Sequence, residues 1–196
     1  MAAFKMLGGA ACLDFTNTVD WRRGEPQELL NTAQDLADWA EQSGTLTMQE
    51  AQELRAEAAR SPGEAEALRL RATALREAVH RIFKAHADGT TPGEADLGHL
   101  NDELTDALSH MALTQEGHDY TLRFRGAPQE KLIWAIAYSA MQLLTGGQLT
   151  RVKECADPRC GWLFLDTSRN GTRRWCSMRD CGNRNKARRH HQRRTG

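Results

Sequence analysis

The stretch that decides the fold of this chain is CADPRCGWLFLDTSRNGTRRWCSMRDCGNRNK, residues 155–186. Its cysteines follow the spacing C-x4-C-x15-C-x4-C, at Cys155, Cys160, Cys176 and Cys181. Two short-spaced pairs, each bent by a turn, bring four thiolates together from two directions, which is a donor set that tetrahedral Zn²⁺ prefers. Four thiolates also fill the coordination sphere and leave no position for a catalytic water. We predict one structural zinc ion at this site.

Disulfides or unrelated thiols are the alternative interpretation of the same four residues. The chain has the features of a cytoplasmic protein, where disulfides are disfavoured. The C-terminal segment, residues 151–196, also contains few apolar residues, so it needs a cross-link or a bound metal in order to fold. Both considerations favour zinc.

The residues between the ligands predict how the metal site is built. Asp157-Pro158 is expected at the centre of a turn in the first pair. Residues 161–175 are expected to form two short strands around a Ser-Arg-Asn-Gly turn, and then a helix carries the last ligands, as in a treble clef. Asp166 is expected to cap that turn or to pair with an arginine. Three aromatic side chains are expected to form a small core rather than to stack on bases: Trp162, Phe164 and Trp175.

The segment GNRNKARRHHQRR, residues 182–194, follows the last cysteine and is predicted to be a helix. No apolar stripe runs through it, so packing does not explain a helix here, whereas a polyanion would stabilise one. Most arginine contacts to nucleic acid are to phosphate, so no sequence-specific readout is inferred. A solvated basic tail without a ligand is the alternative. The predicted nucleic-acid contacts are Arg173, Arg174, Arg184, Lys186, Arg188, Arg189 and Arg193.

The charge of the chain is distributed unevenly, although the formal net charge is zero. Residues 1–150 carry 13 Lys+Arg against 22 Asp+Glu, net −9, and residues 151–196 carry 13 against 4, net +9. The cysteines divide near the same place, since only Cys12 lies outside the last 42 residues. We therefore expect a domain of residues 1–150 and a zinc module of residues 151–196. The basic block indicates an anionic partner, or docking on the acidic front domain.

Residues 1–150 predict a mostly helical domain with a small sheet. An apolar, Thr/Val-rich segment, residues 7–24, is expected to be a strand, and residues 111–126 alternate as a hairpin. The patterns TMQE, SPGE and TPGE are each expected to be capping boxes. The fold class is therefore mainly α with a small antiparallel β-sheet, followed by a treble-clef-like Cys₄ zinc module. The expected helices are residues 32–43, 48–60, 62–87, 92–109 and 128–145.

Polar residues near the N-terminus admit two interpretations. Asp14 and Asn17 could orient a small molecule while Arg22 pairs with an anionic group, which would make a ligand pocket. We favour the other interpretation, in which the polar side chains bond to nearby backbone and hold a strand end against a loop. Cys12 is expected to be a small core residue rather than a nucleophile.

Residues 155–186 closely resemble the CGNR zinc finger, whose name matches the tetrapeptide Cys181–Arg184. The segment CLDFTNTVDWRRGEPQELLNTAQDLADWAEQSG, residues 12–44, is similar to the ABATE domain that precedes this finger in bacterial proteins. All four cysteines match, so the resemblance implies that they are zinc ligands. It also implies a stress-induced transcription regulator, in a family sometimes described as RNA-binding.

The function expected from these features is a bacterial transcription regulator that binds nucleic acid, DNA in preference to RNA, through the zinc module and its basic helix. The front domain would sense a signal, such as a small-molecule effector, or mediate assembly, such as a homodimer. The alternative is a small-molecule-binding protein whose zinc module is docked on the acidic front domain. No dinucleotide, P-loop, zinc-protease or nucleophile-elbow motif is present, so we expect no enzyme. No apolar run is long enough to cross a bilayer, and we expect a cytoplasmic protein without a membrane partner.

Overall fold

The computed structural model describes residues 4–195, with the side chains of residues 116, 189 and 193–195 excepted. The helices are α1 Ala11–Thr16, α2 Ala33–Gln42, α3 Met48–Arg60, α4 Pro62–Ala87, α5 Glu94–Ser109, α6 Pro128–Thr145 and α7 Asn183–Thr195. The strands form antiparallel pairs, β1 Val19–Asp20 with β2 Gln27–Glu28, β3 Met111–Glu116 with β4 Asp119–Phe124, and β5 Val152–Glu154 with β6 Leu163–Leu165. A 3-10 turn covers Leu149–Arg151 and a π-helical turn covers Met178–Gly182. The fold class is therefore as predicted, mainly helical with small antiparallel sheets.

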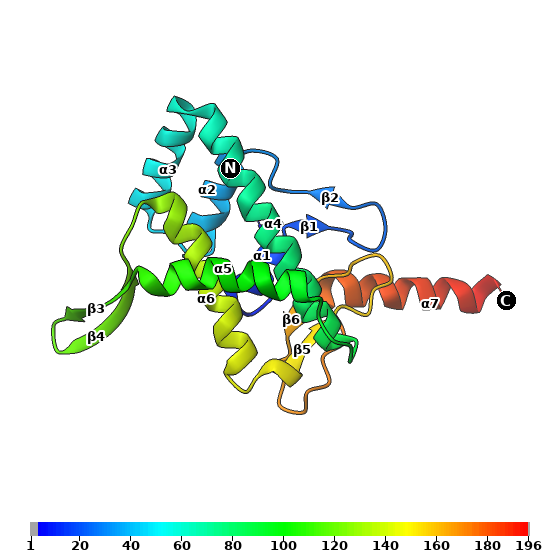
Figure 1. Cartoon of the computed structure of the whole chain (residues 1–196). Helices are drawn as coiled ribbons and strands as arrows, with labels where there is room; N and C mark the ends of the chain where they lie inside the picture. The colour runs from blue at the N-terminus through cyan, green and yellow to red at the C-terminus, as the bar shows by residue number, and fades with distance from the viewer. Residues whose placement is uncertain (1–3, 196) are drawn as a thin grey trace.

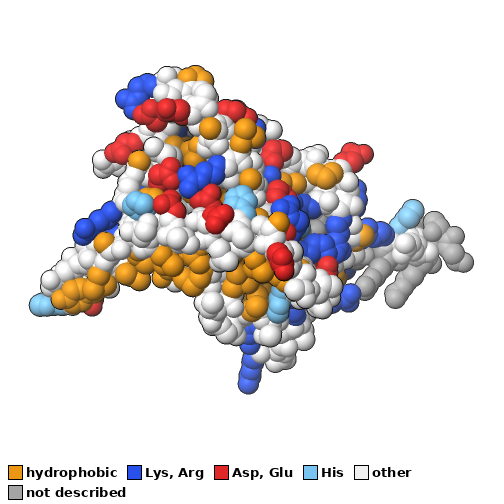
Figure 2. Space-filling view, in the orientation of Figure 1, with side chains coloured by type: hydrophobic (Ala, Val, Ile, Leu, Met, Phe, Trp, Pro, Cys, Tyr) orange, Lys and Arg blue, Asp and Glu red, His pale blue; other side chains and the backbone are white. Residues whose placement is uncertain are grey.

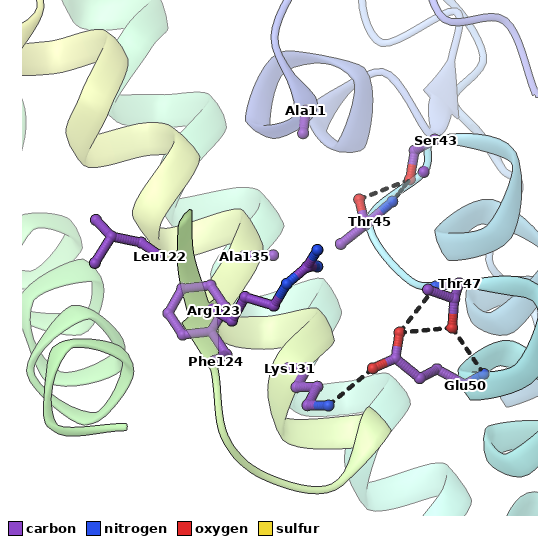
Figure 3. Close-up of a pocket in the computed structure, with 11 residues that line it drawn as sticks. Ala11, Ser43, Thr45, Thr47, Glu50, Leu122, Arg123, Phe124, Lys131 and Ala135 are labelled. Atoms are coloured by element: carbon purple, nitrogen blue, oxygen red, sulfur yellow. Dashed lines mark hydrogen bonds and ion pairs between the residues drawn. The ribbon is translucent and has the colours of Figure 1, made fainter. Parts of the chain in front are cut away.

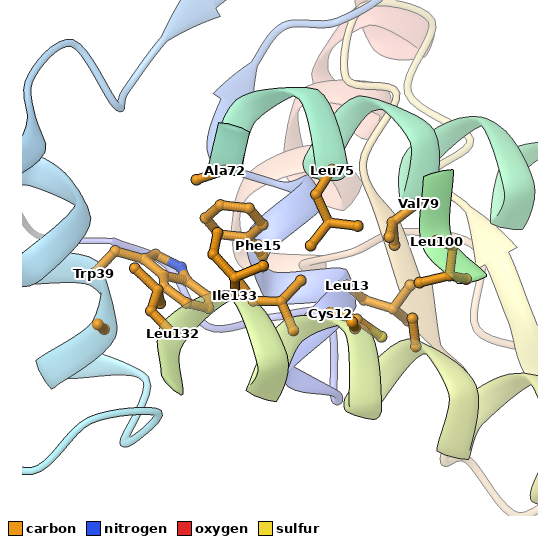
Figure 4. Packing of buried hydrophobic residues seen from close by; sticks show 14 of the residues in the cluster. Cys12, Leu13, Phe15, Trp39, Ala72, Leu75, Val79, Leu100, Leu132 and Ile133 are labelled. Carbon is orange, nitrogen blue, oxygen red and sulfur yellow. The ribbon is translucent and has the colours of Figure 1, made fainter. Parts of the chain in front are cut away.

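The helical body surrounds α1, which contacts α4, α6 and strand β6. The side chains of Leu13 and Phe15 are fully buried between α4 and α6, and Phe15 packs on Trp39 of α2 with ring centroids 4.7 Å apart (Figure 4). Burying a side chain of this size contributes about 2 kcal/mol. The expected apolar helix, α6, lies at the centre of this core, with Leu132, Ile133 and four further apolar residues buried at no more than 2% exposure.

Two projections leave the body on opposite sides (Figure 1). The β3–β4 hairpin extends from the end formed by α5 and α6, and α7 extends from the zinc module at the other end. Within residues 4–195, no helix is long and apolar enough to cross a membrane.

The prediction of a strand at the N-terminal segment is wrong. Residues 11–16 form helix α1, and the strand is confined to Val19–Asp20. Because α1 is surrounded by core, its apolar residues do not alternate with polar ones. A short apolar run of this kind does not distinguish a buried helix from a buried strand.

The helix starts agree with the predictions in two cases and differ in two. Thr32 and Thr47 each cap a helix in a reciprocal capping box. Ser61 does not cap α4, because its hydroxyl donates to Glu57 of the preceding helix at 3.4 Å, so Pro62 opens α4 alone. Helix α5 begins at Glu94 after Gly93, which carries no capping side chain. These two capping boxes were wrongly predicted.

The zinc module shares the core of the helical body. Val152, Leu163 and Leu165 from β5 and β6 belong to the same buried cluster as Leu13 and the α4 and α6 side chains. The side-chain amide of Asn17 donates to the Leu163 carbonyl at 2.9 Å and accepts from the Leu163 N–H at 3.0 Å. The boundary near residue 150 stays a prediction, but packing is continuous across it.

Candidate metal centre and basic helix

The four cysteines meet at one point of the structure. The Sγ atoms of Cys155, Cys160, Cys176 and Cys181 lie within 4.8 Å of one another, and all four residues are buried. Cys176 Sγ is 3.7 Å from Cys160 Sγ and 3.6 Å from Cys181 Sγ. These separations are too long for a disulfide, whose sulfurs are about 2.05 Å apart, and no disulfide joins any of the four cysteines. They match the edge of about 3.8 Å that four sulfurs at about 2.3 Å from a tetrahedral zinc ion require.

The chain presents its ligands from a hairpin and from the start of a helix. Strand β5 leads into Cys155, and the turn that carries Cys160 returns into β6, so the first pair lies in the loop between these two strands. Cys181 lies in the π-helical turn that runs into α7. The four cysteines therefore bind one structural zinc ion, which holds the β5–β6 hairpin against the first turn of the basic helix α7.

The prediction of a hairpin within residues 161–175 is wrong. Strand β6 pairs with β5, which precedes the first ligand, and residues 166–175 form a loop. The loop is held by the buried carboxylate of Asp166, which accepts from the Ser168 and Arg173 N–H groups at 3.0 and 2.9 Å. Its ionic partner is Lys153 Nζ at 2.7 Å rather than an arginine. The predicted cap is confirmed, and these donors lower the pKa of Asp166 below its usual range.

A small second core surrounds the metal site, as predicted for its aromatic residues. Trp162 and Phe164 are buried against the cysteines, and Trp175 packs against them from the edge. Trp162 Nε1 donates to the carbonyl of Val19 at 2.9 Å, which joins this core to strand β1.

Arg184, from the CGNR tetrapeptide, belongs to the metal centre. Its Nη2 donates to Cys181 Sγ at 2.9 Å, and its Nε pairs with the buried carboxylate of Asp157 at 3.3 Å. Asp157 also accepts from the Arg159 N–H at 3.1 Å and from Asn185 Nδ2 at 3.3 Å. Donors to a metal-bound thiolate orient it and tune the site. The sequence predicts a nucleic-acid contact for Arg184 and a turn at Asp157, and no local pattern indicates that the two residues pair.

The β1–β2 loop of the front domain completes this arrangement. The guanidinium carbons of Arg184 and Arg159 lie 4.5 and 4.9 Å from the ring centroid of Trp21, a cation–π arrangement. The N–H groups of Arg22 and Arg23 donate to the carbonyls of Cys160 and Arg159 at 2.9 and 3.2 Å. The front domain therefore contacts directly both the zinc knuckle, which is the loop from Cys155 to Cys160, and the first turn of α7.

The side chain of Arg173 also makes contacts within the zinc module. Its guanidinium donates to the carbonyls of Trp175 and Leu165 at 3.0 and 3.3 Å, and also to the carbonyl of Cys176. It lies 4.4 Å from the ring centroid of Phe164. Arg173 and Arg184 therefore support the zinc module, and their predicted role as nucleic-acid contacts stays a prediction.

The remaining predicted contacts are arranged on or near α7. Arg174 and Lys186 are exposed, and Arg188 is half-buried with Nη2 donating to Asn185 at 2.8 Å. The side chains of Arg189 and Arg193 lie outside the part of the chain that the structure describes. Figure 2 shows Lys and Arg side chains gathered on the side of the body next to α7.

The polar residues near the N-terminus have backbone partners. Asp14 accepts from the Gly8 N–H at 2.7 Å, and the side-chain amide of Asn17 donates to and accepts from the backbone of Leu163. Arg22 donates to the carbonyl of Thr16 at 2.8 and 3.2 Å and forms a two-pronged ion pair with Glu77 at 2.8 and 3.0 Å. These contacts support the structural interpretation rather than a ligand pocket. Cys12 is fully buried, and burial raises the pKa of its thiol to about 12, which agrees with a core role.

Two family models match the chain in the expected order. One matches residues 9–147 and is described as "ABATE: Putative stress-induced transcription regulator", and the other matches residues 151–194 and is described as a CGNR zinc finger. No protein with curated annotation matches the chain. The first model covers well over half of the residues, and the second contains the four clustered cysteines and Arg184. The chain therefore belongs to the ABATE family and carries a CGNR zinc finger with one structural zinc ion.

Proposed function

We propose that this protein is a transcription regulator that binds nucleic acid through α7 and the adjoining surface of the zinc finger. The observation that carries the proposal is the combination of an exposed basic helix without an apolar face and a metal that anchors its first turn. Helix α7 has the sequence NRNKARRHHQRRT, and it extends away from the body (Figure 1). Because packing does not stabilise its outer turns, an anionic ligand is the interaction that its composition fits.

The contacts around Cys181 and Arg184 explain how the start of this helix is held in a fixed position. Arg184 connects the metal ligand, the buried Asp157 and the front domain's Trp21, so the helix starts at a fixed point. Phosphate contacts would then come from the other cations of the predicted set. The proposed set is Arg174, Lys186, Arg188, Arg189 and Arg193.

DNA is the preferred target in this proposal because of the shape of the element. A single helix fits the major groove of B-form DNA, which is about 12 Å wide. The major groove of A-form RNA is deep and narrow, and side chains do not read it. Helix α7 has 13 residues and is about 20 Å long, which is enough to lie along one groove.

The test is a fluorescence anisotropy titration of the zinc-loaded full chain against random-sequence DNA duplexes, RNA duplexes and single-stranded RNA. Five phosphate contacts predict that log K falls against log salt with a slope of about −4.5. The double variant Arg188→Glu plus Arg189→Glu is expected to weaken binding at least tenfold. The control is Arg125→Glu, an exposed arginine at the base of the β3–β4 hairpin, which should bind as the wild type does.

The alternative function is a small-molecule-binding protein in which the zinc finger is an interaction element docked on the front domain. The contacts of Trp21, Arg22 and Arg23 with the zinc knuckle favour the docking part of this alternative. The same titration separates the two functions. Absence of binding at low salt for DNA and for both RNA forms would reject our proposal and favour the alternative.

A further inference from the structure

The β3–β4 hairpin carries an apolar face that the described chain leaves open. Leu113 and Leu122 are opposite one another in the register and are 63% and 55% exposed, and Tyr120 on the same face is 63% exposed. At the base of this face, Phe124 packs against Trp134 and Tyr138 of α6, each with ring centroids 5.9 Å apart. Figure 2 shows an apolar band that runs from the hairpin along the lower side of the body. A two-stranded hairpin is marginally stable alone in water, and such a patch is typical of an interface.

We propose that a second copy of this chain pairs with the outer edge of the hairpin, so that Tyr120 and Leu122 of the two copies pack side by side. The two β4 strands would pair antiparallel across a two-fold axis at Thr121, which would give a four-stranded sheet shared by two protomers. This interface is independent of nucleic-acid binding.

The outer edge of β4 is suited to this pairing. Within residues 4–195, β4 is hydrogen-bonded to β3 alone. The two-residue loop Gly117-His118 makes Glu116 and Asp119 a hydrogen-bonded pair, and such pairs alternate along a hairpin. The backbone N–H and C=O groups of Tyr120 and Leu122 therefore point away from β3, as a template for another strand.

The sequence of β4, Asp-Tyr-Thr-Leu-Arg-Phe, is complementary to itself in one register. With Thr121 opposite Thr121 of the second copy, Tyr120 meets Leu122 and Asp119 meets Arg123, and the two-fold axis makes each contact occur twice. Asp119 makes no ion pair with any side chain that the structure describes, so the cation of the second copy would supply one. Strand β3 lacks this property, because Glu116 is its single charged residue.

The space beside β4 can receive the incoming hairpin. A groove of about 360 Å³ lies between the base of β4, the loop after α2 and helix α6 (Figure 3). Arg123 extends toward this groove from β4, and Lys131 pairs with Glu50 at 2.8 Å on its other side. In an antiparallel pairing, the tip of the second hairpin passes Phe124 and runs toward this groove.

The decisive experiment is a charge exchange measured by analytical ultracentrifugation over a wide concentration range. We expect the wild type to be a dimer, and Arg123→Asp and Asp119→Arg each to weaken the dimer at least tenfold, since like charges would then face each other twice. The double variant Asp119→Arg plus Arg123→Asp should restore the dimer. The two residues are four apart on one strand, about 13 Å, so one chain alone cannot produce this rescue. The control Arg169→Asp, on an exposed loop of the zinc finger, should remain dimeric.

A second measurement keeps the inference testable if a charge variant folds poorly. In the proposed register, Thr121 of each copy is opposite its counterpart at a Cα separation that a disulfide can bridge. Thr121→Cys should cross-link under a mild oxidant such as diamide, whereas Thr114→Cys, across the hairpin and about 14 Å from its counterpart, should not. A monomeric wild type, a dimer that neither charge variant weakens, or equal cross-linking of both cysteine variants would overturn the inference.

Discussion

The guanidinium of Arg184 donates a hydrogen bond to the Sγ of Cys181 across 2.9 Å, so the last residue of the CGNR tetrapeptide is bound to the first. Asp157 and Trp21 hold the same guanidinium from two other directions. Arg184 is therefore a positioning residue that connects the metal, the knuckle and the front domain.

Replacing Arg184 should weaken zinc binding. Arg184→Ala removes a donor to a thiolate ligand and leaves the buried carboxylate of Asp157 without its cation. Loss of such a supporting partner lowers metal affinity by about 10- to 100-fold. A competition titration with a chromophoric chelator measures this change, and Arg188→Ala, about one turn farther along α7, is the matched control. Wild-type zinc affinity in Arg184→Ala would contradict the positioning role.

Removing the metal should disorder the zinc finger before the helical body. Structural zinc supplies folding free energy that a small module lacks without it. Hydrogen exchange after chelation should show loss of protection in residues 155–186, while α4 and α6 retain theirs because their core is largely made by helices. Cys176→Ser should behave as the chelated protein does. Equal loss of protection in α6 would show that the body depends on the metal as well.

His80 should make stability depend on pH. Burial and then the charge of Arg22 lower the pKa of His80 to about 4 from the usual 6.5. Between about pH 6.5 and pH 4 the imidazole is protonated in the unfolded chain but not in the folded chain. The free energy of unfolding is therefore highest above about pH 6.5 and falls as the pH drops toward 4. We expect a loss of about 1 kcal/mol in the free energy of unfolding between about pH 7.5 and pH 5.5. Denaturant titrations in excess zinc measure it.

The control for this pH dependence is His80→Gln, which keeps a polar side chain facing the carbonyl of Gly161. Protonation of the zinc thiolates is common to both proteins and cancels in the comparison. The variant should therefore show a smaller loss of stability than the wild type over the same range. Equal slopes would indicate that His80 is not the group responsible.

Asn17 should be required for stability rather than for binding a ligand. Asn17→Ala leaves the buried N–H and C=O of Leu163 without partners, which costs about 2 kcal/mol. Asn17→Asp keeps the acceptor but loses the donor and buries a charge against the Leu163 carbonyl, so its loss at neutral pH should be at least as large. Thermal unfolding of both variants checks the order. Wild-type stability in Asn17→Ala would reopen the pocket interpretation.

The sequence alone was sufficient to predict those features that depend on residues close together in the chain. Thr32 and Thr47 cap helices because their partners lie three residues away, and α4 and α6 begin at prolines that suit a first helical position. The four cysteines were predictable as zinc ligands because two closely spaced pairs of cysteines are typical of a structural zinc site. The same reasoning failed for α1, where an apolar run has no period to distinguish helix from strand.

The tertiary structure decided the roles of the charged residues. From the sequence, Arg173 and Arg184 are two members of a basic cluster, equivalent to Lys186 or Arg188. Folding places Asp157, Trp21 and the carbonyl of Cys176 around them, and these partners lie up to 163 residues away along the chain. The charge of a side chain is set by its chemistry, so composition reveals it. Whether that charge faces a thiolate or solvent depends on which distant segments the core brings together, and local sequence patterns do not contain that information.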